Sequence, residues 1–171
     1  MRCALLAVSL FLVAAACDSM ERLPASGVAS VVTAGPSSAI TSCRVADGRA
    51  DRRCTPGALN PNVSQANIYG TICVPGWTAT IRPPAGYTNR LKREQKIAYG
   101  ETALTDAQLE EDHLVSLSAG GSPNDPRNLF PQPWPDAHRK DTDEHRVNRD
   151  ICAGRVTLQQ GQAQLLSKWS R

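Results

Sequence analysis

The stretch 111–141, EDHLVSLSAGGSPNDPRNLFPQPWPDAHRKD, constrains the fold of this chain more than any other. Apolar and polar residues alternate well enough over 109–117 to predict a strand. The glycine pair 120–121 predicts a turn, and a short return segment, 128–130, stops at closely spaced prolines because proline cannot donate to a strand ladder. A helix over 136–152 follows, with its first aspartate as the N-cap.

Further elements are predicted on either side of this stretch. Residues 71–74 and 78–82 are β-rich runs split by Pro-Gly, which predicts a short N-terminal β-hairpin. Residues 87–99 have an apolar face, Thr88 as a cap and a glycine stop, which predicts a helix with a basic outer face. Residues 157–169 open on a capping-box pattern and predict a last helix. The expected fold class is therefore α+β, in one small domain.

Length and charge set loose limits on function. The 171 residues suit one modest domain with extensions, and the formal net charge is +3 with a pI near 8.6. Strong nucleic-acid binders often lie above a pI of about 9, so this charge permits a polyanionic partner without requiring one. The sequence has no recognisable helix-turn-helix or zinc-finger pattern, so any nucleic-acid contact would be mainly to the backbone.

The N-terminal residues are typical of a targeting segment. Arg2 precedes the apolar run 4–16, which has the length of a signal peptide and is too short to span a bilayer. The end of the run resembles a bacterial lipobox, which implies that Cys17 is lipidated and anchors the protein to a membrane. The alternative is ordinary secretion with cleavage near Ala16. Residues 18–42 have linker composition, so we expect an exported protein, either a cell-envelope lipoprotein or a periplasmic or secreted one.

Four further cysteines predict disulfides in the domain 43–171. An even number of cysteines in an exported chain implies a disulfide framework, and four allow three connectivities. Pairing Cys43 with Cys54 and Cys73 with Cys152 is favoured, because the first closes a short loop and the second ties the two ends of the domain together. Closing the long loop would contribute about 4 kcal/mol in the chain-entropy model. A zinc site is disfavoured, because no two cysteines form a C-x-x-C pair.

An ordered series of polar residues carries a resemblance to a known family. Asp112-His113 on the predicted strand, Asn128 before the prolines and His138 at the start of the predicted helix follow in order. Asn128 stands 15 positions after His113, and His138 stands 10 positions after Asn128. The series resembles the ββα-metal motif of the HNH endonucleases, and the surrounding pattern resembles exported or phage-associated bacterial HNH-like proteins. The resemblance covers about residues 55–170, with a ββα core at about 108–150.

The resemblance implies a role for each of these residues. A neutral imidazole can take the proton of an attacking water, which is the role expected of His113. Asp112 and His138 are expected to hold one divalent ion, Mg²⁺, Mn²⁺, Zn²⁺ or Ni²⁺, at the scissile phosphate. Asn128 is expected either to orient the His113 ring or to bind the ion, and His145 is a rival third ligand. Because Asp112 and His113 are adjacent, a regular strand would point them to opposite faces.

The expected function is an exported, metal-dependent HNH-type endonuclease that hydrolyses phosphodiester bonds in nucleic acid, with DNA favoured over RNA as the substrate and little sequence preference. Arg127, Arg139 and Lys140 are candidate contacts to nucleic acid. The alternative is a non-catalytic envelope lipoprotein or binding module that retains the HNH scaffold. A third hypothesis is a secreted toxin nuclease, for which an immunity protein would be a partner.

Overall fold

The structure is a computed structural model in which residues 42–171 are described. The predicted targeting segment, with Cys17, and almost all of the predicted linker lie outside the described residues. Within 42–171, no helix is long and apolar enough to cross a membrane. The helices and strands are α1 (Trp77–Ile81), α2 (Ala85–Ala98), β1 (Leu109–His113), β2 (Leu129–Pro133), α3 (Trp134–Cys152) and α4 (Leu158–Trp169), with 3-10 turns at Gln65–Gly70, Asp106–Gln108, Leu117–Ala119 and Pro126–Asn128.

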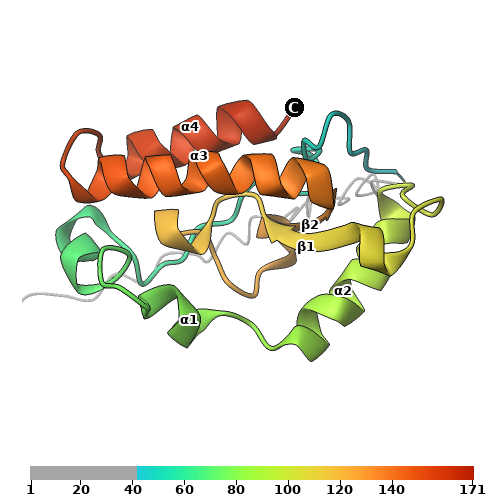
Figure 1. Cartoon of the computed structure of the whole chain (residues 1–171), viewed down its shortest axis with the longest axis horizontal. Coiled ribbons are helices and arrows are strands. Elements are labelled where there is room, and N and C mark those ends of the chain that lie inside the picture. The colour runs from blue at the N-terminus through green and yellow to red at the C-terminus, as the bar shows by residue number, and fades with distance from the viewer. Residues whose placement is uncertain (1–41) are drawn as a thin grey trace, which may run out of the picture. The chain divides into compact units, whose positions relative to one another are not determined.

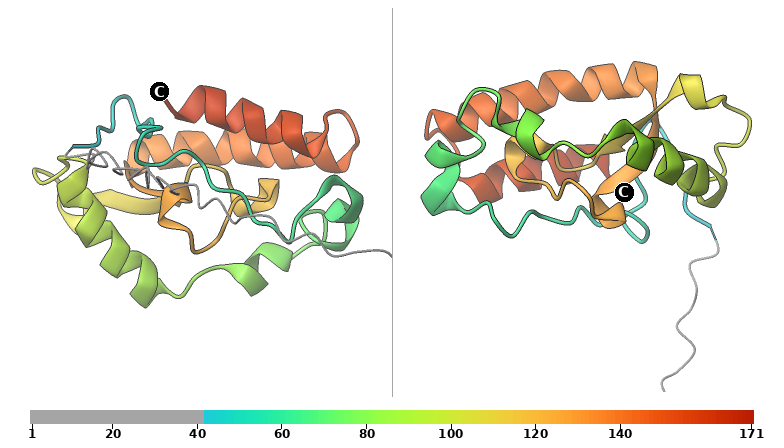
Figure 2. Two further views of the ribbon diagram at one scale, coloured as in Figure 1. Left: turned by 180° about the vertical axis from the view of Figure 1, so that it is seen from behind. Right: turned by 90° about the horizontal axis from the view of Figure 1, so that it is seen from below.

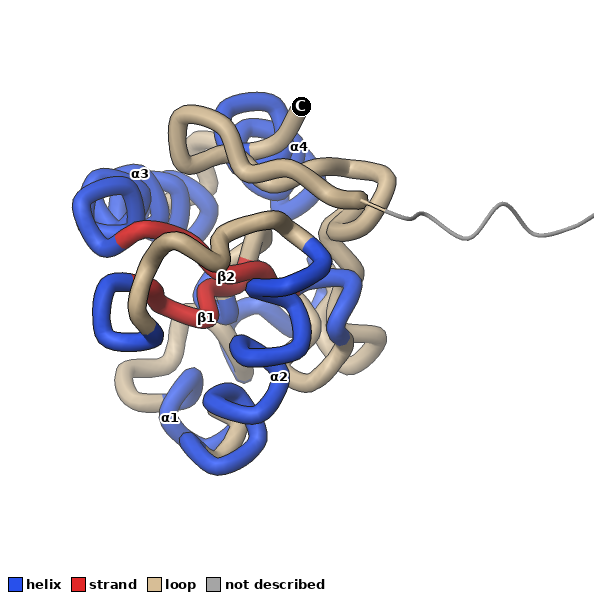
Figure 3. The backbone as a smooth tube through the Cα atoms, turned by 90° about the vertical axis from the view of Figure 1, so that its right-hand side faces the viewer, coloured by secondary structure: helices blue, strands red, loops and turns tan. Residues whose placement is uncertain are grey.

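The centre of the domain is an antiparallel hairpin of β1 and β2. Both strands contact α2 and α3, and α4 packs along α3 (Figure 1). Seen end-on, the two strands lie between α2 and α3 (Figure 3). The structure is therefore a small mixed α+β domain in which a strand–loop–strand–helix unit runs from β1 to α3, as the sequence predicts. Strand β1 ends at His113, however, and the predicted continuation to residue 117 is wrong, because Leu117 begins a 3-10 turn.

Strand β2 continues through Pro131 and Pro133, so the prediction that it stops at residue 130 is wrong. The N–H of Leu114 donates to the carbonyl of Asn128, directly opposite in the register, at 2.8 Å. Because hydrogen-bonded and non-hydrogen-bonded pairs alternate along an antiparallel ladder, both prolines fall at positions where the N–H points away from β1. Proline is tolerated at such positions of an edge strand.

The N-terminal hairpin predicted over 71–74 and 78–82 is also wrong. The first run forms tight turns, with the Val74 N–H donating to the Thr71 carbonyl at 2.8 Å, and most of the second run is the short helix α1. Gly76, at φ 82°, begins that helix in the left-handed region that glycine adopts without strain. Two short runs with no further strand beside them satisfy their backbone groups locally instead.

Two helices begin earlier than predicted, and both begin after a proline. Helix α2 has Pro84 as its N-cap rather than Thr88, and α3 has Pro133 rather than Asp136. The first turn of a helix has no intrahelical acceptor for its N–H groups, so Pro135 fits within the first turn of α3. Helix α4 has the predicted bounds, with Thr157 forming the predicted capping box.

The core lies where α3 and α4 meet the hairpin. A Cβ on Gly161 would approach Ile151 Cδ1 to 2.5 Å and Val147 Cγ1 to 3.0 Å, so a glycine at this position of α4 allows the two helices to pack closely. At the end of α4, the buried indole of Trp169 donates to Asp143 of α3 at 3.1 Å. The core cluster also contains Leu114, Val115, Phe130, Leu158 and Leu165.

Both favoured disulfides are confirmed: Cys43 bonds to Cys54, and Cys73 to Cys152 at the end of α3. The second pair joins residues that are 79 positions apart in the chain. The segment that follows Cys54 runs alongside the connection between β1 and β2 (Figure 2), where the Asn60 N–H donates to the Gly120 carbonyl at 2.9 Å.

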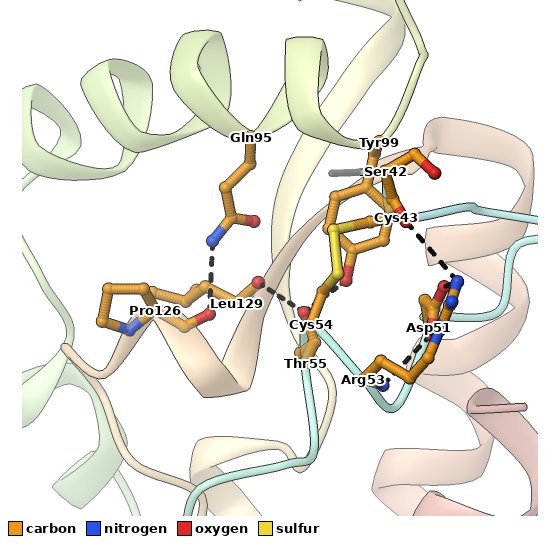
Figure 4. Close-up of a disulfide and its surroundings, with 10 residues drawn as sticks. All are labelled: Ser42, Cys43, Asp51, Arg53, Cys54, Thr55, Gln95, Tyr99, Pro126 and Leu129. Atoms are coloured by element: carbon orange, nitrogen blue, oxygen red, sulfur yellow. Dashed lines mark hydrogen bonds and ion pairs between the residues drawn. A yellow bond between two sulfur atoms is a disulfide. The ribbon is translucent and has the colours of Figure 1, made fainter. Parts of the chain in front are cut away.

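The first disulfide lies beside contacts that join α2 to the hairpin (Figure 4). Thr55, next to Cys54, bonds the Tyr99 hydroxyl and donates to the Leu129 carbonyl at 3.2 Å. Gln95 of α2 donates to the Pro126 carbonyl at 3.2 Å. The disulfide-closed N-terminal loop therefore helps to fix α2 against the start of β2.

Candidate active site

Asn128 organises the loop between the two strands. Its side chain is fully buried, and its Oδ1 accepts from the Val115 N–H at 2.9 Å. Its Nδ2 donates to the Val115 carbonyl at 2.9 Å and to the Ser122 carbonyl at 3.0 Å. A Cβ on Gly121 would lie 1.8 Å from the Val115 oxygen, so the chain can pass this close only as glycine. The Asn128 amide thus bonds the backbone rather than the His113 ring or an ion.

The His113 ring is held by a backbone carbonyl. The side chain is buried at the end of β1, with Nε2 3.0 Å from the carbonyl oxygen of Pro123. A carbonyl only accepts, so Nε2 carries the proton and Nδ1 keeps its lone pair. Burial lowers the pKa of His113, which favours the neutral ring. Pro123 follows Ser122, whose carbonyl Asn128 holds, so Asn128 acts on the ring only through the loop.

Asp112 lies on the other face of β1, towards α3. Its carboxylate accepts from the ammonium of Lys140 at 2.9 Å, and the same ammonium donates to the His113 carbonyl at 2.6 Å and to the Glu144 carboxylate. The Lys140 side chain is 0% exposed. Burial opposes its charge, but the two carboxylates raise the pKa of Lys140 above its usual range. A permanent cation therefore lies directly in front of Asp112.

The two predicted metal ligands have different surroundings, because Asp112 pairs with the buried Lys140 and His138 is exposed. Helix α3 buries Ala137, Lys140 and Asp143 at helical spacing, whereas His138 falls between them and is exposed. Its ring packs on Trp134, with centroids 5.4 Å apart. His145 is exposed as well and lines a separate cavity beside Cys73 and Asn148.

Asp112, one of the two predicted ligands, is paired with a cation of the chain itself. Among residues 42–171, no three His, Cys, Asp or Glu side chains are grouped so that they could hold a metal. The Lys140 ammonium takes the place beside Asp112 that an ion would need. The divalent ion stays a prediction, and no chemical step below is derived from it.

A cavity of about 360 Å³ opens beside His113, on the α2 side of the hairpin. The cavity joins β1 to the segment before α2, to α2 and to the first turn of α3. Its polar and aromatic lining includes Arg82, Thr88, Lys92, Glu110, Glu111, His113 and Trp134.

Two acids in this lining have strongly shifted pKa values. Glu111 is 9% exposed, and neither of its carboxyl oxygens has a hydrogen-bond partner among the described residues. Burial raises the pKa of Glu111 to about 8, although the nearby Lys92 opposes the shift. Burial raises the pKa of Glu110 to about 7, helped by Asp112. The cavity therefore offers a neutral imidazole and protonatable carboxyl groups together near pH 7.

The three predicted nucleic-acid contacts lie in different surroundings. The side chain of Arg127 is 69% exposed and pairs with Asp125 at 2.6 Å, and that of Arg139 is 63% exposed and pairs with Asp136. Lys140 is interior, so it cannot meet nucleic acid without leaving its two carboxylates. On the basic face of α2, Lys92 donates to the backbone carbonyl of Asp106, and Lys96 donates to the Asp106 carboxylate.

Comparison with family models, with curated proteins and with solved structures returned no match to this chain.

The sequence did not predict the roles of Glu111 and Arg82 in the cavity lining, or the ion pair by which Glu144 holds Lys140. The i, i+4 spacing of Lys140 and Glu144 was a usable signal, because such a pair is adjacent on a helix. For Glu111 the usable signal was its position two residues before His113, because alternate residues of a strand share a face.

Proposed function

We propose that the domain is an HNH-like endonuclease that hydrolyses phosphodiester bonds in nucleic acid, with DNA as the expected substrate. The supporting observation is the surroundings of His113: a buried ring, fixed through Nε2 by Pro123, in the wall of a cavity. The loop tied back by Asn128 and the helix after β2 are compatible with a ββα unit.

In this proposal His113 Nδ1 takes the proton of the attacking water, because it is the nitrogen that keeps a lone pair. Arg82 and Lys92 supply positive charge to the cavity that would receive the phosphate. The resemblance assigns further charge neutralisation to a divalent ion, but the Lys140 ammonium bonds Asp112, one of its expected ligands.

Export remains part of the proposal. The two disulfides are consistent with an oxidising extracellular environment, since cytosolic thiols are normally kept reduced. Lipidation of Cys17 and membrane anchoring through it are proposed on the sequence alone.

Plasmid DNA and RNA incubated with the purified, oxidised protein would test the activity, in EDTA and with Mg²⁺, Mn²⁺, Zn²⁺ or Ni²⁺. Removing a general base lowers rates by about 10²–10⁴-fold, so His113→Ala should lose nearly all cleavage. His145→Ala is the matched control, because His145 is exposed on α3 and lines a different cavity. Equal cleavage by wild type and His113→Ala would sink the proposal.

A second candidate is a non-catalytic binding module on the same scaffold, and the buried Lys140 favours it. If the ammonium has replaced a catalytic cation, the domain could keep its fold without keeping the catalytic activity. This candidate expects binding to nucleic acid without cleavage, measured by gel shift, and equal binding by wild type and His113→Ala. A toxin with an immunity protein would instead show cleavage that a co-purifying partner blocks.

A further inference from the structure

Glu111 is a buried acid that lines the His113 cavity, and its carboxyl group has no hydrogen-bond partner within residues 42–171. The side chain is 9% exposed. Lys92, a cation in the same lining, directs its ammonium to the backbone carbonyls of Asp106 at 2.9 Å and Leu109 at 3.0 Å. An ion pair with Lys92 therefore does not account for a glutamate at this position.

The placement of Glu111 relative to His113 follows from the strand. Alternate side chains of a strand share a face, so both residues lie on the same face of β1. Two residues of strand span about 7 Å, which leaves room for a phosphate group between the two side chains. Phosphoryl transfer needs the attacking and leaving oxygens roughly in line on opposite sides of phosphorus. A proton acceptor at one end and a proton donor at the other match that requirement.

Glu110 is the rival acid, because it lines the same cavity. Its side chain starts from the opposite face of β1, the face of Asp112, and the charges that act on it include those of Asp112, Asp141 and Lys140. It is also less buried than Glu111. Position on the strand therefore favours Glu111 as the partner of His113.

We propose that Glu111 is the general acid of this site and protonates the oxygen that leaves phosphorus. The assignment rests on the proposed phosphodiester hydrolysis. A water oxygen forms a bond to phosphorus while His113 Nδ1 takes one water proton. The bond from phosphorus to the leaving oxygen breaks with its electron pair on that oxygen, which takes the carboxyl proton of Glu111. The products are a phosphate monoester and an alcohol, and the site returns to its starting state when the imidazolium loses a proton to solvent and the carboxylate regains one.

This assignment gives the leaving oxygen a source of charge neutralisation within the chain itself. The resemblance gives that task to a divalent ion, yet Asp112, a proposed ligand of that ion, is paired with Lys140. A carboxyl group at this place in the cavity lining can perform the same task by donating a proton.

The leaving group of the substrate tests the role of Glu111 directly. DNA releases an alkoxide that needs a proton, whereas bis(p-nitrophenyl) phosphate releases p-nitrophenolate, which is stable without one. Glu111→Gln keeps the shape of the side chain and removes the acid. We expect Glu111→Gln to cut DNA about 10²–10⁴-fold more slowly and to cleave bis(p-nitrophenyl) phosphate at close to the wild-type rate. Glu101→Gln, a neutralised glutamate outside the cavity, should cleave both like wild type.

Each other outcome overturns the assignment in a recognisable way. Equal losses on both substrates would make Glu111 a structural residue, and no loss on either would remove it from the reaction. A loss confined to DNA in Glu110→Gln, with Glu111→Gln active, would transfer the role to Glu110. If the wild type cleaves neither substrate, the proposed hydrolysis itself falls, and the general acid falls with it.

Discussion

Replacing Lys140 by methionine tests the buried charge cluster, because methionine fills similar space without the ammonium. The change leaves the carboxylates of Asp112 and Glu144 facing each other with side chains only 13% and 16% exposed. Breaking a buried ion pair by removing one partner costs about 3–5 kcal/mol, because the remaining charge stays buried and unpaired. We expect a loss near the lower end, about 3 kcal/mol, since both carboxylates keep some contact with water.

Urea unfolding at pH 7 and at pH 4 would measure this loss. Protonation removes the charge of the unpaired carboxylates, so the difference between wild type and Lys140→Met should shrink as the pH falls. Lys168→Met is the control, because that lysine pairs with Asp143 while its side chain is 59% exposed, and such pairs contribute about 1 kcal/mol or less. A loss at Lys140 no larger than that of the control would refute the reasoning about the cluster.

The same position also tests the metal prediction without any activity assay. Lys140→Ala should open a site with oxygen donors from Asp112, Glu144 and the His113 carbonyl, which suits a hard cation. Mn²⁺ at a hundred times its Kd would then return about 2.7 kcal/mol to the variant and leave the wild type unchanged. Stabilisation of the wild type by Mn²⁺ that disappears in Asp112→Asn would show instead that the native site takes an ion.

Three further predictions concern the loop, the second disulfide and Glu111. Asn128→Ala removes three hydrogen bonds of a buried amide and should cost about 3 kcal/mol in thermal or urea unfolding; a loss below about 1 kcal/mol would contradict the role of the loop. Replacing Cys73 and Cys152 together by alanine should cost about 4 kcal/mol, while dithiothreitol should then destabilise the variant less than the wild type. The pKa of Glu111 is raised from 4.5 to about 8, so the folded protein retains a proton that the unfolded chain releases, and stability falls as the pH rises through that window. Urea titrations from pH 4 to 9 should show a smaller fall for Glu111→Gln, and parallel curves would refute the shift.

Local signals predicted the elements whose causes are local. The capping box at Thr157 fixes the start of α4 within a few residues of chain, and the structure reproduces it. Cysteine count and spacing were enough to favour the right disulfide pairing, because four cysteines in a chain predicted to be exported are expected to pair with one another. The prolines of β2 misled the prediction, since their effect depends on the ladder position, which only the partner strand sets.

Tertiary context decided the rest. The β-rich residues of 71–82 form turns and α1, because no other strand within residues 42–171 pairs with them. The residues next to Lys140 in the sequence are as polar as those of a solvated helix face. Lys140 is nevertheless buried, because β1 packs against this face of α3. His138, two positions earlier, is exposed because it lies on a face of α3 that is turned away from β1. Helical spacing sets which residues share a face, and packing sets which face is buried.

The Cys73–Cys152 bond makes the candidate site a closed covalent ring, because everything from α1 to α3 lies between the two cysteines. A protease that cuts the exposed link at Thr102 and Ala103, between α2 and β1, would not separate the two pieces. The piece with α2 and the piece with the hairpin and α3 would stay tethered, at a high effective concentration for each other. A nicked molecule could therefore reassemble its cavity, and only reduction of this disulfide would release the two pieces from each other.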